Sequence, residues 1–191
     1  MQIVKLKQSE DNNAMEIFTI GHSTHSCEEF ISMLKSFEIK TLVDVRSYPG
    51  SRHVPQFNKE NMAQWVVLAD IEYLHMPQLG GRRRKMPEID DRLVEGWNHI
   101  AFKNYAAYTL TQEYQEGLNE LAKIVRRTKT CIMCAESVPW KCHRLLISNS
   151  LAFEGFCVRH ILEENKSVTH QINKYGAKAV FDGKKVIYPK S

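Results

Sequence analysis

The segment between Cys131 and Arg144 concentrates residue types that do chemistry in proteins. It holds two thiols at Cys134 and Cys142, and an imidazole and a guanidinium follow the second thiol directly. A thiol beside Arg and His at a helix N-terminus ionises more readily and becomes a nucleophile. We therefore interpret Cys142 as the first candidate nucleophile and Cys134 as the second.

The local pattern predicts how these groups are positioned. The apolar run over 131–136 is typical of a buried strand, the polar, Pro-containing residues after it predict a loop, and an apolar helical pattern covers 142–153. In open α/β sheets, ligands bind at the carboxyl ends of the strands, where a helix N-terminus offers unpaired N–H groups to an anion. The sequence therefore predicts a site at this strand, loop and helix junction.

Polar residues and a pair of glycines also end or follow three other predicted strands, over 16–20, 41–45 and 72–76. Parallel strands bring their carboxyl ends to one edge of a sheet, so we expect these residues to share one crevice with Cys142. In chain order they are His22, Ser23, Asp44, Arg46, Arg52, Gly80, Gly81 and Arg82.

The leading hypothesis is an enzyme, a hydrolase or a transferase, that binds a phosphorylated or nucleotide-like anion in this crevice. Arg side chains can hold such an anion bidentately, and carboxylates and imidazoles can act as general acids or bases. The candidate catalytic residues are Cys142, Glu136, His22, Asp44 and Cys134. The candidate substrate-binding residues are Arg46, Arg52, Ser23, Gly80, Gly81, Arg82, His143 and Arg144. The ten positions from Cys134 to Arg144 do not fit the short phosphate loop of Cys-dependent phosphatases.

A zinc or iron site is a second hypothesis. Its candidate ligands are Cys134, Cys142 and His143, with Glu136 nearby and His22 or His170 from elsewhere in the chain. Cys131 and Cys134 have the spacing of a ligand pair, but residues three apart in a strand point to opposite faces. The sequence therefore identifies no cofactor.

A third hypothesis is a nucleic-acid-binding module without catalysis. The Arg residues could contact phosphates, and the aromatic side chains of Tyr48, Trp65, Tyr73 and Trp140 could stack on bases. The net charge of only +4 argues against dedicated nucleic-acid binding.

Each candidate also has a purely structural interpretation. Asp44 can simply pair with Arg46, and Arg144 can neutralise Glu136, because buried charges need partners. Cys131 is expected to be a small core residue, and His160, inside an apolar strand, a hydrogen-bonded core histidine.

Composition narrows the class of protein. The chain has 191 residues and five cysteines, an odd number that predicts reduced thiols in a cytosol rather than a disulfide scaffold. We expect no signal peptide and no membrane span, since no long apolar run is present. The expected partner is an anionic small molecule or nucleotide in a cytoplasmic protein, and the sequence does not indicate the oligomeric state.

Strands that alternate with helices predict an α/β fold, a three-layer α/β/α sandwich with a largely parallel central sheet. Further helices are expected after the Ser26 capping box and over 58–69 and 111–127, with a last strand over 156–162 and no structure assigned to 87–103. We divide the chain into a flexible extension over 1–15, with a short strand proposed at 1–7, a single domain over 16–175, and a hairpin or tail over 176–191. Asp182-Gly183 is the hairpin signal.

Six short motifs in order resemble one family. The motifs are Thr19-Ile20-Gly21-His22-Ser23, Asp44-Val45-Arg46 with Pro49 and Ser51, Leu79-Gly80-Gly81, Asn104-Tyr105-Ala106-Ala107-Tyr108, Cys134-Ala135-Glu136 with Pro139-Trp140-Lys141-Cys142-His143-Arg144, and Val158-Arg159-His160-Ile161. Over 17–170 the chain resembles the domain of unknown function 488 family. The resemblance implies a single, cytosolic α/β domain of bacterial or archaeal type and implies no reaction.

Overall fold

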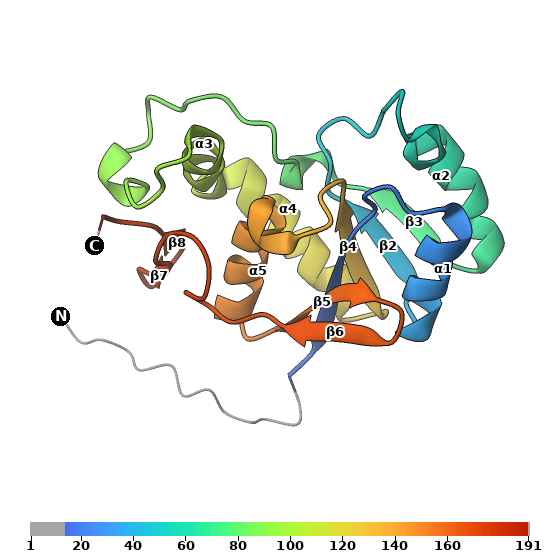
Figure 1. Cartoon of the computed structure of the whole chain (residues 1–191). Helices are drawn as coiled ribbons and strands as arrows, with labels where there is room; N and C mark the ends of the chain where they lie inside the picture. Colours follow the sequence, from blue (N-terminus) through green and yellow to red (C-terminus); the bar gives the residue numbers. More distant parts are fainter. Residues whose placement is uncertain (1–13, 191) are drawn as a thin grey trace.

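The computed structural model describes residues 14–190, and its centre is a six-stranded sheet in the order β3-β2-β4-β1-β5-β6 (Figure 1). The first five strands in the chain run parallel, and β6 is antiparallel to β5. The bounds are β1 (Glu16–Gly21), β2 (Thr41–Asp44), β3 (Glu72–His75), β4 (Thr130–Cys134), β5 (Cys157–Glu163) and β6 (Lys166–Thr169). The predicted α/β fold with a largely parallel sheet is confirmed. The strand proposed over 1–7 and most of the extension over 1–15 lie outside the described residues.

Helices cover both faces of the sheet (Figure 1). On one face, α1 (Cys27–Ser36) and α2 (Lys59–Trp65) pack on Phe18 and Ile20 of β1. On the other, α3 (Ile100–Thr109), α4 (Gln112–Val125) and α5 (Arg144–Phe153) pack on Ile17, the neighbour of Phe18. Successive strand residues point to opposite faces, so the apolar run in β1 serves both cores and the sheet is the middle of three layers.

Local signals fix the ends of two helices. The Ser26 side chain accepts the Glu29 N–H at 3.1 Å and the Glu29 carboxylate accepts the Ser26 N–H at 2.9 Å, so the predicted capping box begins α1. Thr111 caps α4 by accepting the Tyr114 N–H, and Tyr114, Leu118 and Leu121 form its buried stripe. The helix predicted over 58–69 is α2 followed by a short 3₁₀ helix at Val67–Ala69.

Three features differ from the sequence prediction. Residues 100–109 form α3, although we assigned no structure to 87–103, and residues 166–169 add the unpredicted antiparallel strand β6. Helix α5 begins at Arg144 rather than at Cys142, because Pro139–Lys141 forms a separate 3₁₀ helix and leaves Cys142 extended. The candidate nucleophile therefore lies just before the helix.

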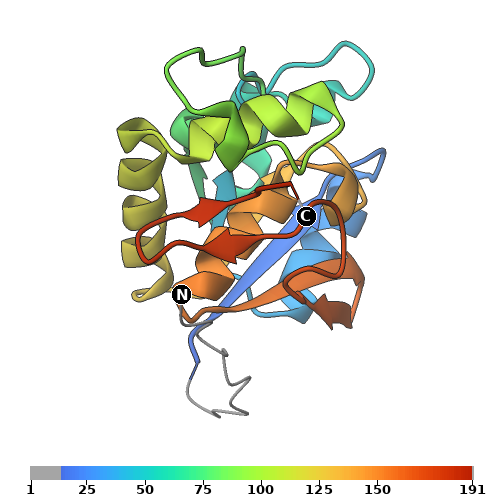
Figure 2. The ribbon, with the colours of Figure 1, turned by 90° about the vertical axis from the view of Figure 1, so that its left-hand side faces the viewer.

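The C-terminal segment completes the core on the α5 face. Strands β7 (Val180–Phe181) and β8 (Val186–Ile187) pair antiparallel around the Asp182-Gly183 turn and lie in front of α5 in Figure 2. Ala179 and Tyr188 are buried there. The residues expected to form a hairpin or tail thus pack on the same core as the sheet. In the part of the chain that the structure describes, no helix has the length and apolar character needed to cross a membrane.

Strand order determines where a ligand can enter. Neighbouring strands β1 and β4 lead into α1 and α5, which lie on opposite faces of the sheet. The two outgoing chains therefore separate at the carboxyl end of this strand pair, which is the usual place for a crevice in an open α/β sheet. The loop after β2 borders the same point, since β2 is the other neighbour of β4.

Candidate functional site

A cavity of about 380 Å³ opens at the carboxyl ends of these strands. Seven of the predicted site residues line it, namely Arg46, Gly81, Arg82, Cys134, Glu136, Cys142 and His143. His22, Ser23, Asp44, Arg52, Gly80 and Arg144 do not line it. The common crevice expected from the strand ends is therefore present, but only half of the candidate residues reach it.

Two thiols line the cavity. Cys134 ends β4 and Cys142 follows the 3₁₀ helix, and their sulfurs lie 2.7 Å apart. Each sulfur also accepts a backbone N–H, from Glu136 at 3.4 Å for Cys134 and from Arg144 at 3.5 Å for Cys142. Such donors stabilise a sulfur that carries negative charge.

The two thiols differ in acidity. Burial opposes ionisation of Cys142, but the hydrogen bond from Cys134 and the positive charge of Arg144 outweigh it and lower the pKa of Cys142 to about 6. The same hydrogen bond, together with burial, raises the pKa of Cys134 well above its ordinary value. At neutral pH the pair therefore holds one thiolate, on Cys142, and one thiol, on Cys134.

The His143 ring is held in one tautomer. Its Nε2 lies 2.9 Å from the Val45 carbonyl oxygen, which can only accept, so Nε2 carries the proton. Its Nδ1 then presents a lone pair 3.4 Å from the Cys142 sulfur. Burial lowers the pKa of His143 and keeps the ring neutral. Gly81 packs so tightly against this ring that a Cβ there would collide with Nδ1.

Arg144 is fully buried beneath the thiols. Its guanidinium donates to Thr19 Oγ1 at 3.2 Å and to the backbone carbonyl oxygens of Glu136 and Ser137. The interpretation that Arg144 neutralises Glu136 is wrong, because the contact is to the backbone and the Glu136 side chain is exposed. Burial opposes the charge of Arg144, but the neighbouring Cys142 and Cys134 raise its pKa.

No carboxylate lies within ion-pair distance of Arg144 in residues 14–190. A buried guanidinium needs a counter-charge, and the Cys142 thiolate is the anion that the site offers. Arg144 is a positioning residue beneath the cavity rather than a contact for substrate.

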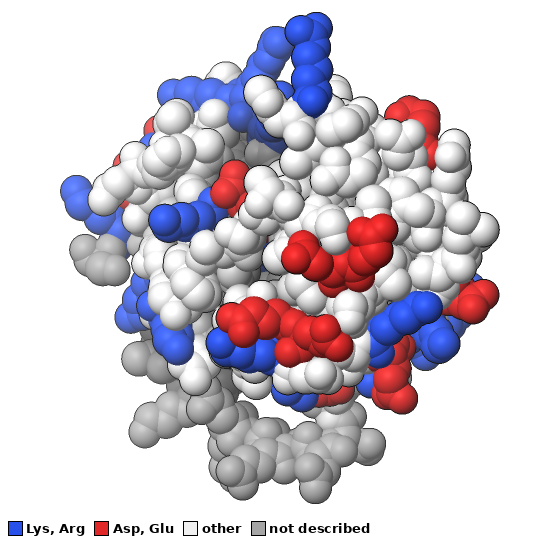
Figure 3. Space-filling view, turned by 45° about the vertical axis from the view of Figure 1, so that its right-hand side comes forward, with Lys and Arg blue, Asp and Glu red and all other residues white. Residues whose placement is uncertain are grey.

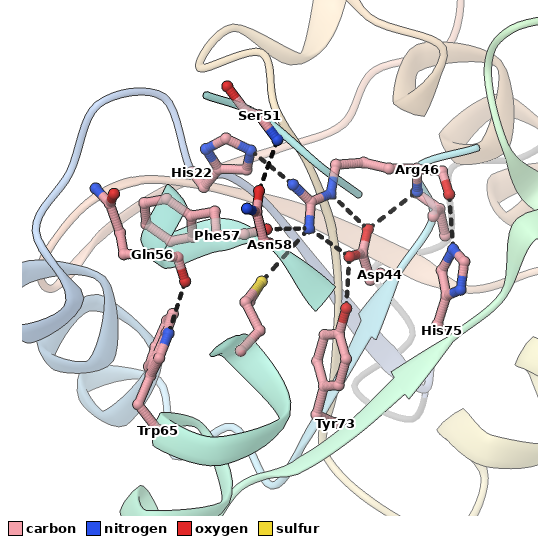
Figure 4. Close-up of polar contacts among 12 residues, drawn as sticks. His22, Asp44, Arg46, Ser51, Gln56, Phe57, Asn58, Trp65, Tyr73 and His75 are labelled. Carbon is pink, nitrogen blue, oxygen red and sulfur yellow. Dashed lines mark hydrogen bonds and ion pairs between the residues drawn. The ribbon is translucent and has the colours of Figure 1, made fainter. Parts of the chain in front are cut away.

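A second buried cluster lies beside the cavity (Figure 4). Arg46 donates to both oxygens of Asp44, at 2.8 and 2.6 Å, and Tyr73 donates to the same carboxylate at 2.7 Å. The Nη1 atom of Arg46 lies 3.1 Å from His22 Nε2, and the Nη2 atom that donates to Asp44 at 2.6 Å also donates to the Phe57 carbonyl at 2.8 Å. The structural interpretation of Asp44 and Arg46 as a pair is the one that the geometry matches, and it leaves Asp44 no free oxygen to act as a base.

His22 is part of this cluster. Its Nδ1 lies 2.9 Å from the Ser23 carbonyl oxygen and must carry the proton, so Nε2 accepts from Arg46. The ring stacks on Phe57 with centroids 4.3 Å apart. Burial lowers the pKa of His22 to about 4, so the ring is neutral at pH 7 with both nitrogens occupied. This placement makes His22 a support for Arg46 rather than a proton donor to substrate.

The remaining predictions separate clearly. Ser23 is half-buried, and Arg52 is exposed in the loop after β2, away from the cavity lining. Cys131 faces the α1 and α2 core, on the opposite side of the sheet from Cys134, so these two residues do not form a ligand pair. His160 is a hydrogen-bonded core histidine as expected, 2.9 Å from Thr19 Oγ1 and 3.1 Å from His170.

Several residues that line the cavity were missed from the sequence. They include Ser47, His99, Phe102, Tyr105 and Lys141, and Tyr48 was named only as a base-stacking candidate. Lys141 directly precedes Cys142, and Tyr105 lies in the Asn104 to Tyr108 motif, so both carried a signal of position. The sequence around Tyr105 did not predict which residue its ring would contact. In the structure, the centroid of this ring lies 5.2 Å from that of His143.

The Asp44 and Arg46 pair yields a stability prediction. Asp44→Asn removes the counter-charge of a buried guanidinium, so we expect the free energy of unfolding to fall by about 3 to 5 kcal/mol in urea denaturation. Asp90→Asn is the matched control, because Asp90 pairs with Arg92 on the surface, at 2.6 Å. Equal stability losses for the two variants would contradict the buried-pair interpretation.

Comparison with known proteins identifies one relationship. Residues 26–151 match the family described as Domain of unknown function DUF488. This match spans α1 to α5 and includes the thiols, His143 and Arg144. No curated protein and no solved structure matches the chain. Since the match covers most of the sequence, the chain belongs to the DUF488 family, as the motifs indicated.

Proposed function

We propose that this protein is a thiolate-dependent enzyme, a hydrolase or a transferase, that acts on a phosphorylated or nucleotide-like anion. The observation that carries the proposal is the Cys142 sulfur in the cavity wall, above a buried Arg144 that has no carboxylate partner in the described part of the chain. A stored thiolate at neutral pH is a reactive group that packing alone does not require.

His143 completes a nucleophile arrangement. Its unprotonated Nδ1 is directed at the Cys142 sulfur, and its Nε2–H is held by the Val45 carbonyl. Any Cys142 that is protonated can therefore pass its proton to Nδ1 when the sulfur attacks an electrophilic atom of the substrate. The resulting imidazolium can return the proton to a leaving group, which is the sequence of steps in covalent group transfer.

The rim of the cavity favours an anionic substrate. Arg82 and Lys141 are exposed and line it, and neither belongs to an ion pair among the described residues. Basic side chains also gather at the top of Figure 3, the end of the molecule where the parallel strands end. The rings of Phe102 and Tyr105 form part of the wall and offer an apolar surface beside the charges. A phosphate or carboxylate next to a planar or apolar group fits this combination.

The thiolate is testable by alkylation. We expect the rate at which iodoacetamide modifies Cys142, followed by peptide mass spectrometry, to rise with a midpoint near pH 6. Cys157 is the internal control, because burial raises its pKa and it should react only in alkaline solution. Cys142→Ser should abolish the acidic phase and leave Cys157 unchanged. A Cys142 midpoint in the ordinary thiol range would contradict the proposal.

The anion site is testable with ligands. We expect a panel of nucleoside phosphates and sugar phosphates to contain a compound that raises the melting temperature of the protein. Arg82→Ala and Lys141→Ala should each weaken its binding about tenfold, the effect of losing one charge-assisted hydrogen bond.

Arg84→Ala is the charge-matched control, since Arg84 is exposed on the same loop as Arg82 and does not line the cavity. If Arg84→Ala reduces the ligand-induced rise in melting temperature as much as Arg82→Ala does, the ligand is attracted to the basic surface in general. That result would contradict a site in the cavity.

A metal centre is a second candidate function that one observation favours. One ligand atom each from Cys134, Cys142 and His143 lie within 4.8 Å of one another, and the Val45 carbonyl holds the outer nitrogen of His143 as in many zinc sites. Against it, Zn²⁺ with two thiolates would add no negative charge to balance Arg144, whereas one thiolate without metal balances it. The test is the zinc content of the purified protein and of two variants. Stoichiometric zinc that is lost in Cys134→Ala and kept in Arg82→Ala would favour the metal centre over the thiolate enzyme.

A further inference from the structure

We propose that Cys134 and Cys142 are also a two-electron redox pair, which a hydroperoxide oxidises to an intramolecular disulfide. The inference rests on the reactive Cys142 of the proposed function and assigns a separate role to Cys134. In the proposed function, Cys134 only donates the hydrogen bond that favours the Cys142 thiolate and undergoes no reaction itself.

The geometry of the pair carries the inference. The sulfurs are 2.7 Å apart, which is within about 0.7 Å of the S–S bond length of roughly 2.05 Å. Both residues also line the cavity, so a small oxidant can reach them. The other cysteines are elsewhere: Cys131 faces the opposite core, and Cys27 and Cys157 are half-buried in other elements.

The chemistry proceeds in two balanced steps. The Cys142 thiolate attacks the terminal oxygen of the hydroperoxide, the O–O bond breaks, and the departing alkoxide or hydroxide takes a proton from solvent. Cys142 is then a sulfenic acid. The Cys134 sulfur attacks the sulfur of Cys142, an S–S bond forms, and the hydroxyl leaves as water with the Cys134 proton. The two thiols lose two electrons and the hydroperoxide gains them.

The surroundings of Cys134 suit it to the second step. The hydrogen bond to Cys142 and burial keep Cys134 a thiol while Cys142 is a thiolate. Conversion of Cys142 to a neutral sulfenic acid removes that neighbouring charge. The charge of Arg144, which favours a Cys134 thiolate, then acts without opposition from Cys142, so Cys134 becomes nucleophilic only after the first step.

The same charge predicts that the disulfide is easily reversed. Arg144 stabilises the dithiol form through the thiolate, and the disulfide carries no charge to replace it. A redox pair whose reduced form is stabilised in this way is readily reduced by external thiols. We therefore expect oxidation to be reversible rather than a permanent structural bridge.

The experiment exposes the full-length reduced protein to one equivalent of hydrogen peroxide, blocks the remaining thiols with N-ethylmaleimide, and maps tryptic peptides by mass spectrometry. Cleavage after Lys129, Lys141 and Arg144 places the two cysteines in separate peptides. We expect the peptide of residues 130–141 to be linked to that of 142–144, with two of the five thiols lost and both recovered after dithiothreitol.

Two variants identify the sulfur atoms. Cys134→Ser should trap Cys142 as a sulfenic acid that dimedone labels, because no second thiol resolves it. Cys131→Ala is the matched control, since Cys131 shares a tryptic peptide with Cys134 but faces the other core, and it should form the disulfide as the unaltered protein does.

The outcomes separate the two proposals. If Cys142 alkylates with its midpoint near pH 6 but peroxide produces no linked peptides, the redox inference fails and the thiolate enzyme stands. Linkage through Cys131, or oxidation of Cys142 beyond the sulfenic acid while Cys134 stays free in the unaltered protein, also overturns the redox inference. If Cys142 reacts with neither reagent, both proposals fail.

Discussion

The central physical constraint in this structure is the guanidinium of Arg144, which is buried with no carboxylate within ion-pair distance in residues 14–190. Desolvation of a single charge costs several kcal/mol even after relaxation, so the fold must place an anion nearby. The backbone carbonyls and Thr19 that bond Arg144 supply dipoles but no charge. The charge of Arg144, together with the hydrogen bond from Cys134, lowers the pKa of Cys142 against the effect of burial. Burial and the hydrogen bond to Cys142 keep Cys134 protonated, and burial keeps His143 neutral.

Arg46 is also buried, but unlike Arg144 it has a carboxylate partner among the described residues and needs no other counter-charge. Arg46 follows β2 and lines the same cavity, but its charge is neutralised by Asp44, which lies two residues earlier in the chain. That pair needs nothing from a ligand, and together with His22 and Tyr73 it fixes the loop after β2 against β1. Arg46 therefore lines the cavity with its charge already neutralised, whereas in the described part of the chain the charge of Arg144 is balanced only by the neighbouring thiol pair. Residues of the same type and similar burial thus differ in function because of their counter-charges.

Much of the fold could be predicted because its signals are local. The capping box at Ser26, the apolar strand around Ile132 and the stripe that includes Leu118 are each visible within a few residues. Helix α3 was missed because its burial changes along the helix rather than around it: residues 100–104 are exposed or half-buried, while Tyr105 and the four residues after it are buried. Such a segment has little helical periodicity to detect. Strand β6 is short and mostly exposed, so its pattern was equally weak.

The sequence predicted where the crevice lies but not what each residue near it does. The strand order brings the ends of β1, β2 and β4 together, and any polar residue near those ends became a candidate. Whether such a residue faces the cavity depends on contacts between residues far apart in the chain. Asp44 bonds Tyr73 and His143 bonds Val45, and no local pattern announces either contact. Sequence spacing therefore located the crevice and left the assignment of catalytic, supporting and structural residues to the packing.

The two histidines behind Arg144, His160 and His170, are both neutral and leave Cys142 as the group that balances the charge of Arg144. A row of hydrogen bonds runs from Thr19 through His160 and His170 to Asn149. Thr19 accepts from Arg144 and can donate to His160 at 2.9 Å. His160 can then donate to His170 at 3.1 Å, and His170 to Asn149 at 2.9 Å, so every member of the row has a partner. This row requires both rings to be neutral. Burial, with smaller effects of His170 and Arg144, lowers the pKa of His160 to about 3, and burial lowers the pKa of His170 to about 4. The row thus orients Arg144 without carrying any charge of its own. The only anion that the described surroundings of Arg144 can offer at neutral pH is the sulfur that faces the cavity.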